Sequence, residues 1–221
     1  MPAADPVFVI RPANEAGCAD LEKVFGTRGS GFRCQCQRYK LAPRESFGSV
    51  PVEDRADRLR DQTGCGDPEA PTTSGLVAYL HDGPVGWCAV ESRPAYQGLL
   101  RVFRTPWDGR DEDRSDPSVW AITCLFARAG YRRRGVSRAL ARAAVEFARQ
   151  RGARAVEAYP MTTTSHPTKS SASLRYFAGT PSSAIAEELH VGTTRTFADA
   201  GLVEVSRPSP RRVVMRLELR D

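Results

Sequence analysis

The stretch VWAITCLFARAGYRRRGVSRALARAAVEFARQRGARAVEAY, residues 119–159, decides the fold. Val119–Ala127 is an apolar run and predicts a buried strand. After a polar turn, Ser137–Arg151 carries apolar residues at helical spacing and ends at Gly152, a usual helix stop. Ala155–Tyr159 predicts a further strand, so the stretch indicates strand, turn, helix and strand in an α/β fold. The apolar face of the helix, which we expect to pack on the sheet, consists of Val136, Leu140, Ala143, Ala144 and Phe147.

The turn before this helix has the properties of an anion-binding site. Gly135 lets the backbone approach a ligand closely. The first turn of the helix leaves N–H groups without intrahelical partners, at the positive end of the helix dipole. Arg132, Arg133 and Arg134 add side-chain charge beside it. On these residues alone two interpretations stay open: a cradle for a diphosphate, or a solvated basic turn ahead of a surface helix.

Further elements lie on both sides of this stretch. Leu76–His81 and Val85–Ser92 flank Asp82-Gly83, the strongest hairpin signal in the chain. Asn14 suits the N-cap of a helix. The remaining predicted elements are a strand at Val7–Arg11, helices at Asn14–Phe25, Val52–Gln62 and Thr193–Ala200, and strands at Leu202–Ser206 and Arg212–Leu219.

Composition narrows the class of protein. The 221 residues are 41% hydrophobic and 26% charged, which excludes a disordered or fibrous chain. They suit a single domain over residues 1–221, with long polar loops at about 93–118 and 160–188. No apolar run reaches the roughly 18 to 20 residues that cross a bilayer, and the start lacks the pattern of a secretory signal. We therefore expect a cytoplasmic protein without a membrane partner.

Charge and cysteine content limit which ligands and partners we expect. The net charge is +6, and all but three of the 32 basic residues are arginines, which favour phosphates and carboxylates. In a reducing compartment the six cysteines are expected to be free thiols. Cys34 and Cys36 form a CxC pair, but no second close pair or histidine pair completes a zinc site, so no metal is expected. Alternation on a half-buried strand is the preferred interpretation of this pair.

Three motifs together resemble the GCN5-related N-acetyltransferase (GNAT) family. Arg132–Ser137 is similar to the family's acetyl-coenzyme A signature, R/Q-x-x-G-x-G/A, between the expected strand and helix. Phe197–Leu202 resembles the family's Y-E-K-x-G-F ending of the last helix, and the hairpin around Val85-Gly86-Trp87 lies where the family has its second and third strands. The resemblance implies a twisted, mixed, mostly antiparallel sheet of about seven strands, flanked by about four helices. It also implies a splay between the fourth and fifth strands.

The resemblance implies acetyl-CoA as co-substrate and direct transfer of its acetyl group to a primary amine in a ternary complex. The acceptor would be a small molecule or a peptide, and relatives often form homodimers. The sequence shows no interleaved aromatic and basic pattern, so nucleic acid is not expected as a partner. The family's strand that pairs with pantetheine corresponds to Leu125, Phe126 and Ala127. Its pyrophosphate loop corresponds to Arg132, Arg133, Arg134, Gly135, Val136, Ser137 and Arg138.

The chain departs from the family at the positions that carry catalysis. Phe197 replaces a tyrosine that often protonates the leaving thiolate, and Thr123 and Cys124 stand where many relatives have a glutamate base. Tyr159 and Glu157, on the strand beside the presumed splay, are the candidate acid and base. Their structural alternatives are packing in the sheet for Tyr159 and an ion-paired carboxylate for Glu157.

These departures also motivate a second functional class, a non-catalytic acyl-CoA-binding or regulatory module on the same fold. Acceptor recognition is expected from Gly29–Arg44, Arg93–Ser118 and Met161–Ala186. Within the second of these, the acidic run from Asp108 to Asp116 has two interpretations, attraction of a cationic amine or a merely solvated loop. His166 and His190 are the histidines in or near the third, and no sequence pattern fixes either of them at the site.

Overall fold

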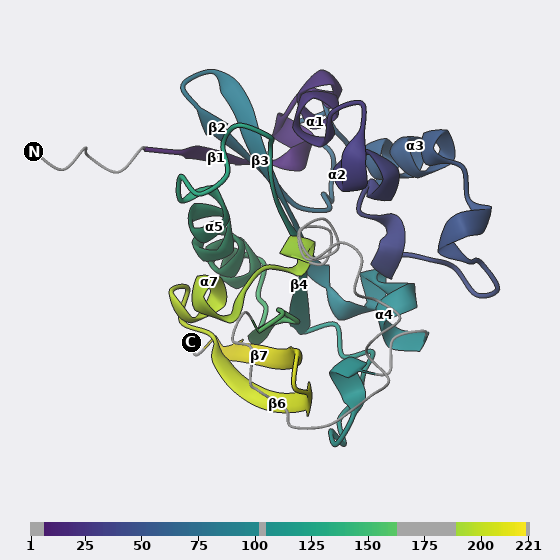
Figure 1. The fold of residues 1–221 in the computed structure, drawn as a ribbon, viewed down its shortest axis with the longest axis vertical. Helices are drawn as coiled ribbons and strands as arrows, with labels where there is room; N and C mark the ends of the chain where they lie inside the picture. Colours follow the sequence, from purple (N-terminus) through teal and green to yellow (C-terminus); the bar gives the residue numbers. More distant parts are fainter. Residues whose placement is uncertain (1–6, 102–104, 163–188, 220–221) are drawn as a thin grey trace, which may run out of the picture.

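Strands from both ends of the chain join one mixed sheet. The computed structural model describes residues 7–101, 105–162 and 189–219 (Figure 1). Its strand order is β1-β2-β3-β4-β5-β7-β6, with β4 and β5 parallel and every other neighbouring pair antiparallel. The strands are β1 Val9–Pro12, β2 Leu76–Leu80, β3 Gly83–Ser92, β4 Val119–Ala127, β5 Ala155–Ala158, β6 Val203–Ser209 and β7 Arg212–Glu218. The expected seven-stranded sheet is confirmed.

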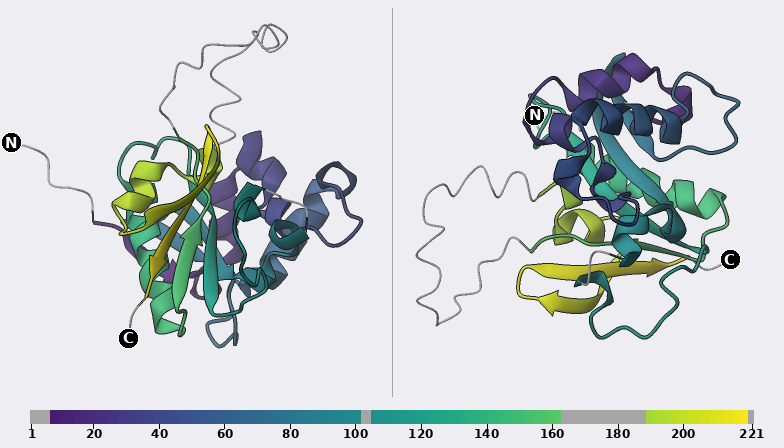
Figure 2. Two further views of the ribbon diagram at one scale, coloured as in Figure 1. Left: turned by 90° about the horizontal axis from the view of Figure 1, so that it is seen from below. Right: turned by 90° about the vertical axis from the view of Figure 1, so that its right-hand side faces the viewer.

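Helices cover both faces of this sheet (Figure 2). On one face α5 packs with α7, and on the other lie α1 and the short helices that follow it. The α-helices of the described residues are α1 Cys18–Phe25, α2 Gly29–Cys34, α3 Val52–Thr63, α4 Gln97–Arg101, α5 Val136–Gln150 and α7 Thr194–Ala198. Short 3-10 turns are η1 Ala13–Glu15, η2 Gln37–Tyr39, η3 Phe47–Ser49, η4 Arg93–Ala95, η5 Thr105–Trp107 and η7 Leu189–Val191. Helices α2 and α4 were not predicted from the sequence.

The main hydrophobic core lies between α5 and the sheet. The predicted apolar face of α5 points into this core, where Val136, Leu140, Ala144 and Phe147 are buried and Ala143 is partly buried. Gly86 of β3 permits the contact, because a Cβ there would lie 2.5 Å from Cγ1 of Val136. The start of α5 is thereby fixed against the sheet.

Strands β4 and β5 separate partway along their length, as expected. Their pairing runs only from Val119–Ala155 to Ile122–Ala158, whereas β4 continues to Ala127. A bulge interrupts the pairing of β4 with β3, where Val90 faces Ile122 and Ala89 faces Cys124, so Thr123 is the extra residue. The splay and the bulge therefore coincide at the middle of β4.

Several local predictions near the amino terminus are wrong. The first helix begins at Cys18 with Gly17 as its N-cap, not at Asn14. Asn14 is buried in η1, where its backbone N–H donates to Oγ1 of Thr73 at 3.1 Å. Cys34 and Cys36 do not lie on a strand: Cys34 ends α2, and Cys36 follows it in a left-handed backbone conformation.

One cysteine pair is bonded, which corrects the expectation of free thiols throughout. Cys18 at the start of α1 forms a disulfide with Cys65, just beyond α3, across a Cα–Cα distance of 5.0 Å. The other four cysteines are free. Because 47 residues separate the pair, only the packing of α1 against the end of α3 brings the two thiols together.

Among the described helices, none has both the length and the apolar character that a membrane span requires.

Candidate functional site

The turn between β4 and α5 is exposed and held in unusual backbone conformations. Gly130, Arg133 and Gly135 all have positive φ, of 88°, 61° and 89°. Gly135 is the left-handed N-cap of α5 and makes no side-chain cap hydrogen bond. A Cβ at Gly135 would meet nothing closer than 3.7 Å, so the space beside this backbone is open.

The amides at the start of α5 face this open turn. Arg138 and Ala139 both donate to the carbonyl of Gly135, at 3.0 Å each, so the N–H groups ahead of them precede the helical ladder. Helix α5 extends from Val136 to Gln150, long enough for its dipole to favour an anion at this end. The stretch 132–137 therefore presents a row of donors of the kind that holds a diphosphate.

The residues of the predicted pyrophosphate loop differ in their exposure and in their contacts. Arg132 and Arg133 are exposed, and the guanidinium of Arg134 lies over the ring of Tyr131 at 5.5 Å. The side chain of Arg138 forms an ion pair at 3.0 Å with Asp199, at the end of α7, and is therefore not directed at the turn. Val136 has its side chain in the core, and Ser137 is half-buried in the first helical turn.

The strand predicted for pantetheine has one unpaired edge. Leu125, Phe126 and Ala127 pair with β3 on one side, and on the other no described strand pairs with them. This edge runs from the bulge at Thr123 to the turn that precedes α5. The β4 edge and the amide row adjoin at this turn and offer backbone polar groups, which fits coenzyme A. Residues 125–127 and 132–137 would hold it, and its thioester supplies an acyl group when bound.

A cavity of about 350 Å³ opens on the bulged part of β4, on the side away from α5. Segments far apart in the chain form its walls. Its lining is Ser30, Arg33, Cys34, Cys36, Arg38, Tyr39, Phe47, Thr123, Cys124, His190, Val191 and Arg212. A second cavity, of about 250 Å³, shares Arg38, Tyr39 and Arg212 with it and reaches Tyr159.

His190 stands in the wall of the larger cavity, although no sequence pattern placed it there. Its Nε2 lies 2.5 Å from Oγ of Ser30, and its ring centroid lies 5.0 Å from that of Phe126. The turn η7 carries it, and the helix α7 that follows is capped by Thr193, which accepts from the N–H of Thr196. His166 lies outside the described residues.

Two thiols and one phenol of this cavity hold their protons at neutral pH. Burial raises the pKa of the Cys34 thiol to about 11 and raises that of Cys36 well above its usual range. Burial also raises the pKa of Tyr39. Among the described residues no carboxylate lines either cavity. His190 is thus the one lining side chain of the described part that ordinarily gains or loses a proton near neutrality.

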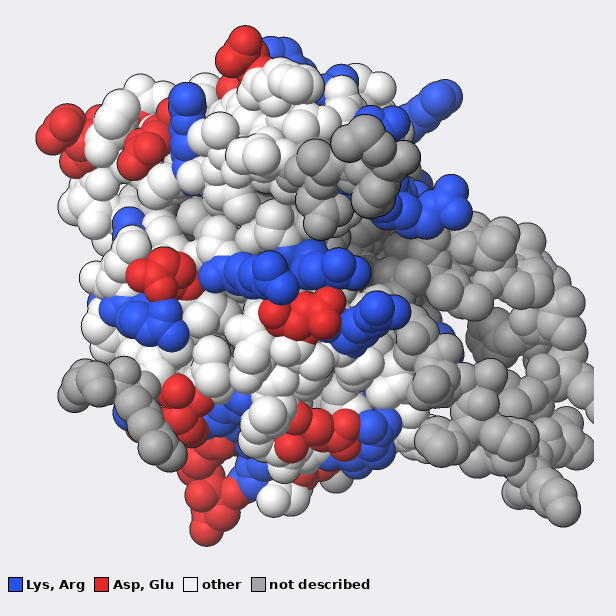
Figure 3. All heavy atoms as spheres, turned by 90° about the vertical axis from the view of Figure 1, so that its left-hand side faces the viewer, with Lys and Arg blue, Asp and Glu red and all other residues white. Residues whose placement is uncertain are grey.

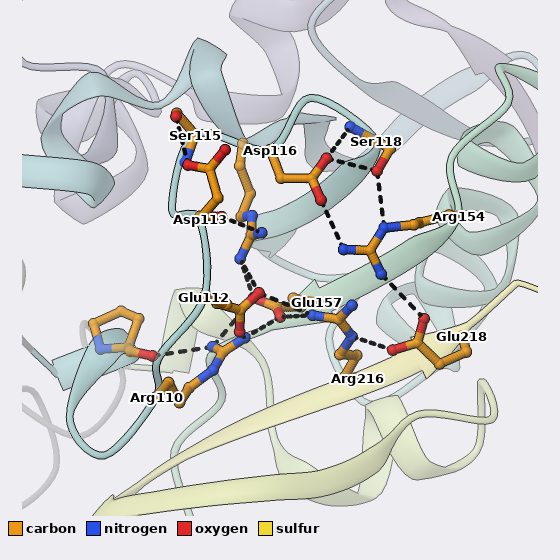
Figure 4. A network of polar contacts seen from close by, with 12 residues as sticks. Arg110, Glu112, Asp113, Ser115, Asp116, Ser118, Arg154, Glu157, Arg216 and Glu218 are labelled. Atoms are coloured by element: carbon orange, nitrogen blue, oxygen red, sulfur yellow. Dashed lines mark hydrogen bonds and ion pairs between the residues drawn. The ribbon is translucent and has the colours of Figure 1, made fainter.

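Glu157 and Tyr159, the predicted base and acid, belong to a buried ion cluster (Figure 4). Glu157 is fully buried and bonds to Arg110, to Arg216 at 2.8 Å, and lies 3.7 Å from Arg93. The hydroxyl of Tyr159 donates to Oε2 of Glu157 at 3.1 Å. Burial and then the charge of Glu157 raise the pKa of Tyr159 well above its usual range. The carboxylate is saturated by cations, and the phenol is a poor acid in this place.

The acidic run of the 93–118 connection is largely committed to neighbours within the chain. Glu112 pairs with Arg93 at 3.0 Å and with Arg216 at 3.2 Å. Asp116 bonds to Arg154 at 2.7 Å and accepts from Ser118. Because these carboxylates fasten the connection to β5 and β7, the structure favours a scaffolding role over attraction of a cationic amine.

The arginine excess is also spread among ion pairs. On the face that carries α5 and α7, basic side chains alternate with acidic ones rather than forming one positive patch (Figure 3). Arg138 pairs with Asp199 and Arg149 with Glu146 on these helices. A search for groups of three or more His, Cys, Asp and Glu side chains able to hold a metal ion finds none in the described ranges.

Comparison with known proteins agrees with this geometry. The family model described as "Acetyltransferase (GNAT) family" matches residues 37–172. No curated protein sequence matches the chain.

Solved structures match the chain at low identity. A GCN5-related N-acetyltransferase from Kribbella flavida is 16% identical, with a TM-score of 0.50, over 96% of this chain and 98% of that one. Ribosomal-protein-alanine N-acetyltransferase from Brucella melitensis is 14% identical, with a TM-score of 0.48, over 96% and 99%. The yncA protein from Salmonella typhimurium, solved with its cofactor acetyl-CoA, is 13% identical with a TM-score of 0.48, over 97% and 95%.

The family match spans more than half of the chain and includes the splayed strands, the arginine-rich turn and helix α5. The chain belongs to the GNAT family of acetyltransferases.

Proposed function

We propose that this chain transfers the acetyl group of acetyl-CoA to a primary amine. The observation that carries the proposal is the continuity of three features along β4. The amide row at the start of α5 leads along the unpaired edge of Leu125–Ala127, and this edge leads to a cavity at Thr123 and Cys124. A diphosphate at the first feature and a pantetheine along the second would bring a thioester to the third.

The reaction balances without a covalent enzyme intermediate. A bound ammonium group first loses a proton to become a nucleophilic amine. Its nitrogen then attacks the thioester carbonyl, a C–N bond forms, and the C–S bond breaks. The nitrogen loses its second proton, the thiolate gains one, and one proton passes to solvent overall.

We assign the first proton transfer to His190. It is the one imidazole in the wall of the cavity, and among the described residues no carboxylate competes with it there. Its contact with Oγ of Ser30 at 2.5 Å fixes the ring, so Ser30 is a positioning residue. Glu157 and Tyr159 are then assigned to the ion cluster that supports β5, rather than to proton transfer.

Calorimetry with coenzyme A and release of free thiol in the presence of primary amines test the proposal. We expect binding of coenzyme A and amine-dependent thiol release with acetyl-CoA. Failure of coenzyme A to bind would overturn the assignment. Binding without turnover across amines of differing charge would favour the non-catalytic acyl-CoA-binding module.

The role of His190 has its own test in the pH profile. We expect His190→Asn to lower kcat/KM about 100-fold and to flatten the acidic limb of its pH dependence. Ser30→Ala should shift that limb with a smaller loss. His81→Asn is the matched control, because His81 lies in the turn between β2 and β3. An unchanged acidic limb in His190→Asn would remove this residue from proton transfer.

A further inference from the structure

We propose that the amine acceptor is a small molecule that carries an anionic group, a carboxylate or a phosphate, held by Arg38 and Arg212. This inference rests on the proposed acetyltransfer and specifies its substrate class. The two arginines come from segments far apart in the chain: Arg38 from η2 and Arg212 from the start of β7. Both line both cavities.

The charge of the cavity walls is the first argument. Three arginines line the larger cavity, Arg33, Arg38 and Arg212, and the described residues supply no aspartate or glutamate to either one. A diamine or polyamine would bring its second cation against the guanidinium groups of Arg38 and Arg212, where the described lining residues supply no counter-charge. An anionic group on the acceptor would instead find planar donors that suit carboxylate and phosphate oxygens.

The second argument is that Arg38 and Arg212 converge on one place. Both line the two cavities together with Tyr39. The positive charge of each also lowers the pKa of Tyr39, against the larger opposite effect of burial. Arg38, Tyr39 and Arg212 therefore lie where the two cavities adjoin.

The third argument is that these two arginines are uncommitted, unlike the others around them. Arg110 and Arg216 are bonded to Glu157 and Glu112 in the ion cluster. For Arg38 and Arg212, the described residues include no ion-pair partner. The guanidinium of Arg38 rests over the ring of Phe47 at 5.6 Å, which leaves its edge able to donate.

The fourth argument is the extent of the two cavities. Thr123, Cys124 and His190, where the acetyl group would arrive, line the larger cavity alone, whereas Arg38 and Arg212 also line the smaller one. A volume of about 350 Å³ fits a small molecule whose amine lies near Thr123 and whose anion lies at the arginine pair. An amino acid, an ω-amino acid and an aminoalkyl phosphate or phosphonate all have this form.

Matched acceptor pairs test the inference on the full-length protein. Each pair differs at the far end of the molecule only: β-alanine against β-alaninamide, γ-aminobutyrate against 1,4-diaminobutane, and phosphoethanolamine against ethanolamine. Thiol release from acetyl-CoA gives kcat/KM, and mass spectrometry identifies the acetylated product. We expect the anionic member to be favoured about tenfold or more in at least one pair, mainly through KM. The carboxylate and phosphate arms tell which anion is preferred.

Charge reversal sharpens the test. Arg212→Glu and Arg38→Glu should each lower kcat/KM for the preferred anionic amine more than tenfold and raise that for 1,4-diaminobutane. Arg207→Glu makes the same change of charge on an exposed residue of β6 that pairs with Glu204, and it should leave the preference unchanged. Thermal unfolding checks that all three variants fold.

The outcomes separate this inference from the proposed function. Turnover of uncharged or cationic amines with rejection of every anionic partner would overturn the inference and leave acetyltransfer intact. If no amine is acetylated, the pairs are titrated into the coenzyme A-saturated protein by NMR. Preferential binding of the anionic members, lost in Arg212→Glu, would then support the anion site without turnover, and equal or absent binding would refute it.

Discussion

The cofactor side and the acceptor side of this molecule are built in opposite ways. The surface proposed for coenzyme A comes from one continuous stretch, residues 125–137, and is made mainly of backbone groups. The cavity proposed for the acceptor is made of side chains whose positions range from Ser30 to Arg212. A backbone surface depends on local conformation, whereas the cavity depends on how distant segments pack.

The two sides also differ in what stabilises them. The cofactor side rests on the hydrophobic contact between α5 and β3, at Gly86 and Val136. The acceptor side is held by the ion cluster around Glu157, which joins β5, β7 and the 93–118 connection. Substitutions that damage one side should therefore leave the other measurably intact.

The largest expected effect is on the acceptor side, from Glu157→Gln. Loss of this carboxylate leaves the buried Arg93 and Arg110 with Glu112 as their remaining carboxylate partner among the described residues, and breaking a buried pair costs about 3–5 kcal/mol. Urea unfolding should show a decrease of this size in the free energy of unfolding. Glu146→Gln, in an exposed pair with Arg149, is the control and should change it by less than about 0.5 kcal/mol. Equal effects in both variants would show that the cluster does not support the fold.

The next effect is on the cofactor side, from Gly135→Glu. The new side chain places a negative charge at the start of α5 and strains a backbone with φ of 89°. We expect the affinity for coenzyme A to fall at least about 100-fold by calorimetry, which corresponds to about 2.7 kcal/mol. Gly152→Glu is matched to it, since Gly152 has φ of 74° and open space around it at the far end of α5. Similar losses in both variants would mean that charge or strain, not position, weakens binding.

A smaller effect should follow from Gly31→Ala, which acts on the acceptor side alone. A Cβ at Gly31 would lie 2.6 Å from Cζ of Phe126, so α2 or the ring must move. Because Phe126 packs against His190, the contact of His190 with Ser30 would be disturbed. We expect kcat/KM for the amine to fall about tenfold and the affinity for coenzyme A to change less than threefold.

The control for this variant is Gly48→Ala, at a position where a Cβ meets nothing within 4 Å. It should leave both quantities unchanged. A loss of coenzyme A affinity in Gly31→Ala equal to the loss in kcat/KM would show that the two sides are not independent.

The contrast between the two sides explains how much the sequence could predict. The strand Val119–Ala127, the hairpin and the apolar face of α5 were predicted because each depends on residues close together in the chain. The amide row follows from the same local pattern. Near Asn14 the local signal failed, because residues far along the chain hold Asn14 in η1: its backbone N–H donates to Oγ1 of Thr73 and its side-chain amide donates to the carbonyl of Pro68.

The acceptor cavity could not be predicted in the same way. No local pattern shows that His190 approaches Ser30, since 160 residues separate them. The spacing of residues in the sequence could not show that arginines from three segments surround Glu157. Its position on a strand beside Tyr159 was equally compatible with a catalytic role. The disulfide and the arginine pair near Tyr39 could likewise be identified only from the folded structure.

The smallest expected effect is the acid sensitivity of the ion network on the acceptor side. Ser118 and then Arg154 lower the pKa of Asp116, while Arg110 and Arg93 lower that of Glu112 against the opposing effect of burial. A carboxylate with a lowered pKa contributes stability above its unfolded-state pKa of about 4, and this is lost as pH falls through the folded-state value. The free energy of unfolding should therefore fall between pH 5 and pH 3, measured by urea titration. Asp116→Asn should reduce the decrease by less than about 1 kcal/mol, because the pair is partly exposed. Asp57→Asn, in an exposed pair with Arg60 on α3, should leave the decrease unchanged, and a larger effect there would place the acid sensitivity outside the network.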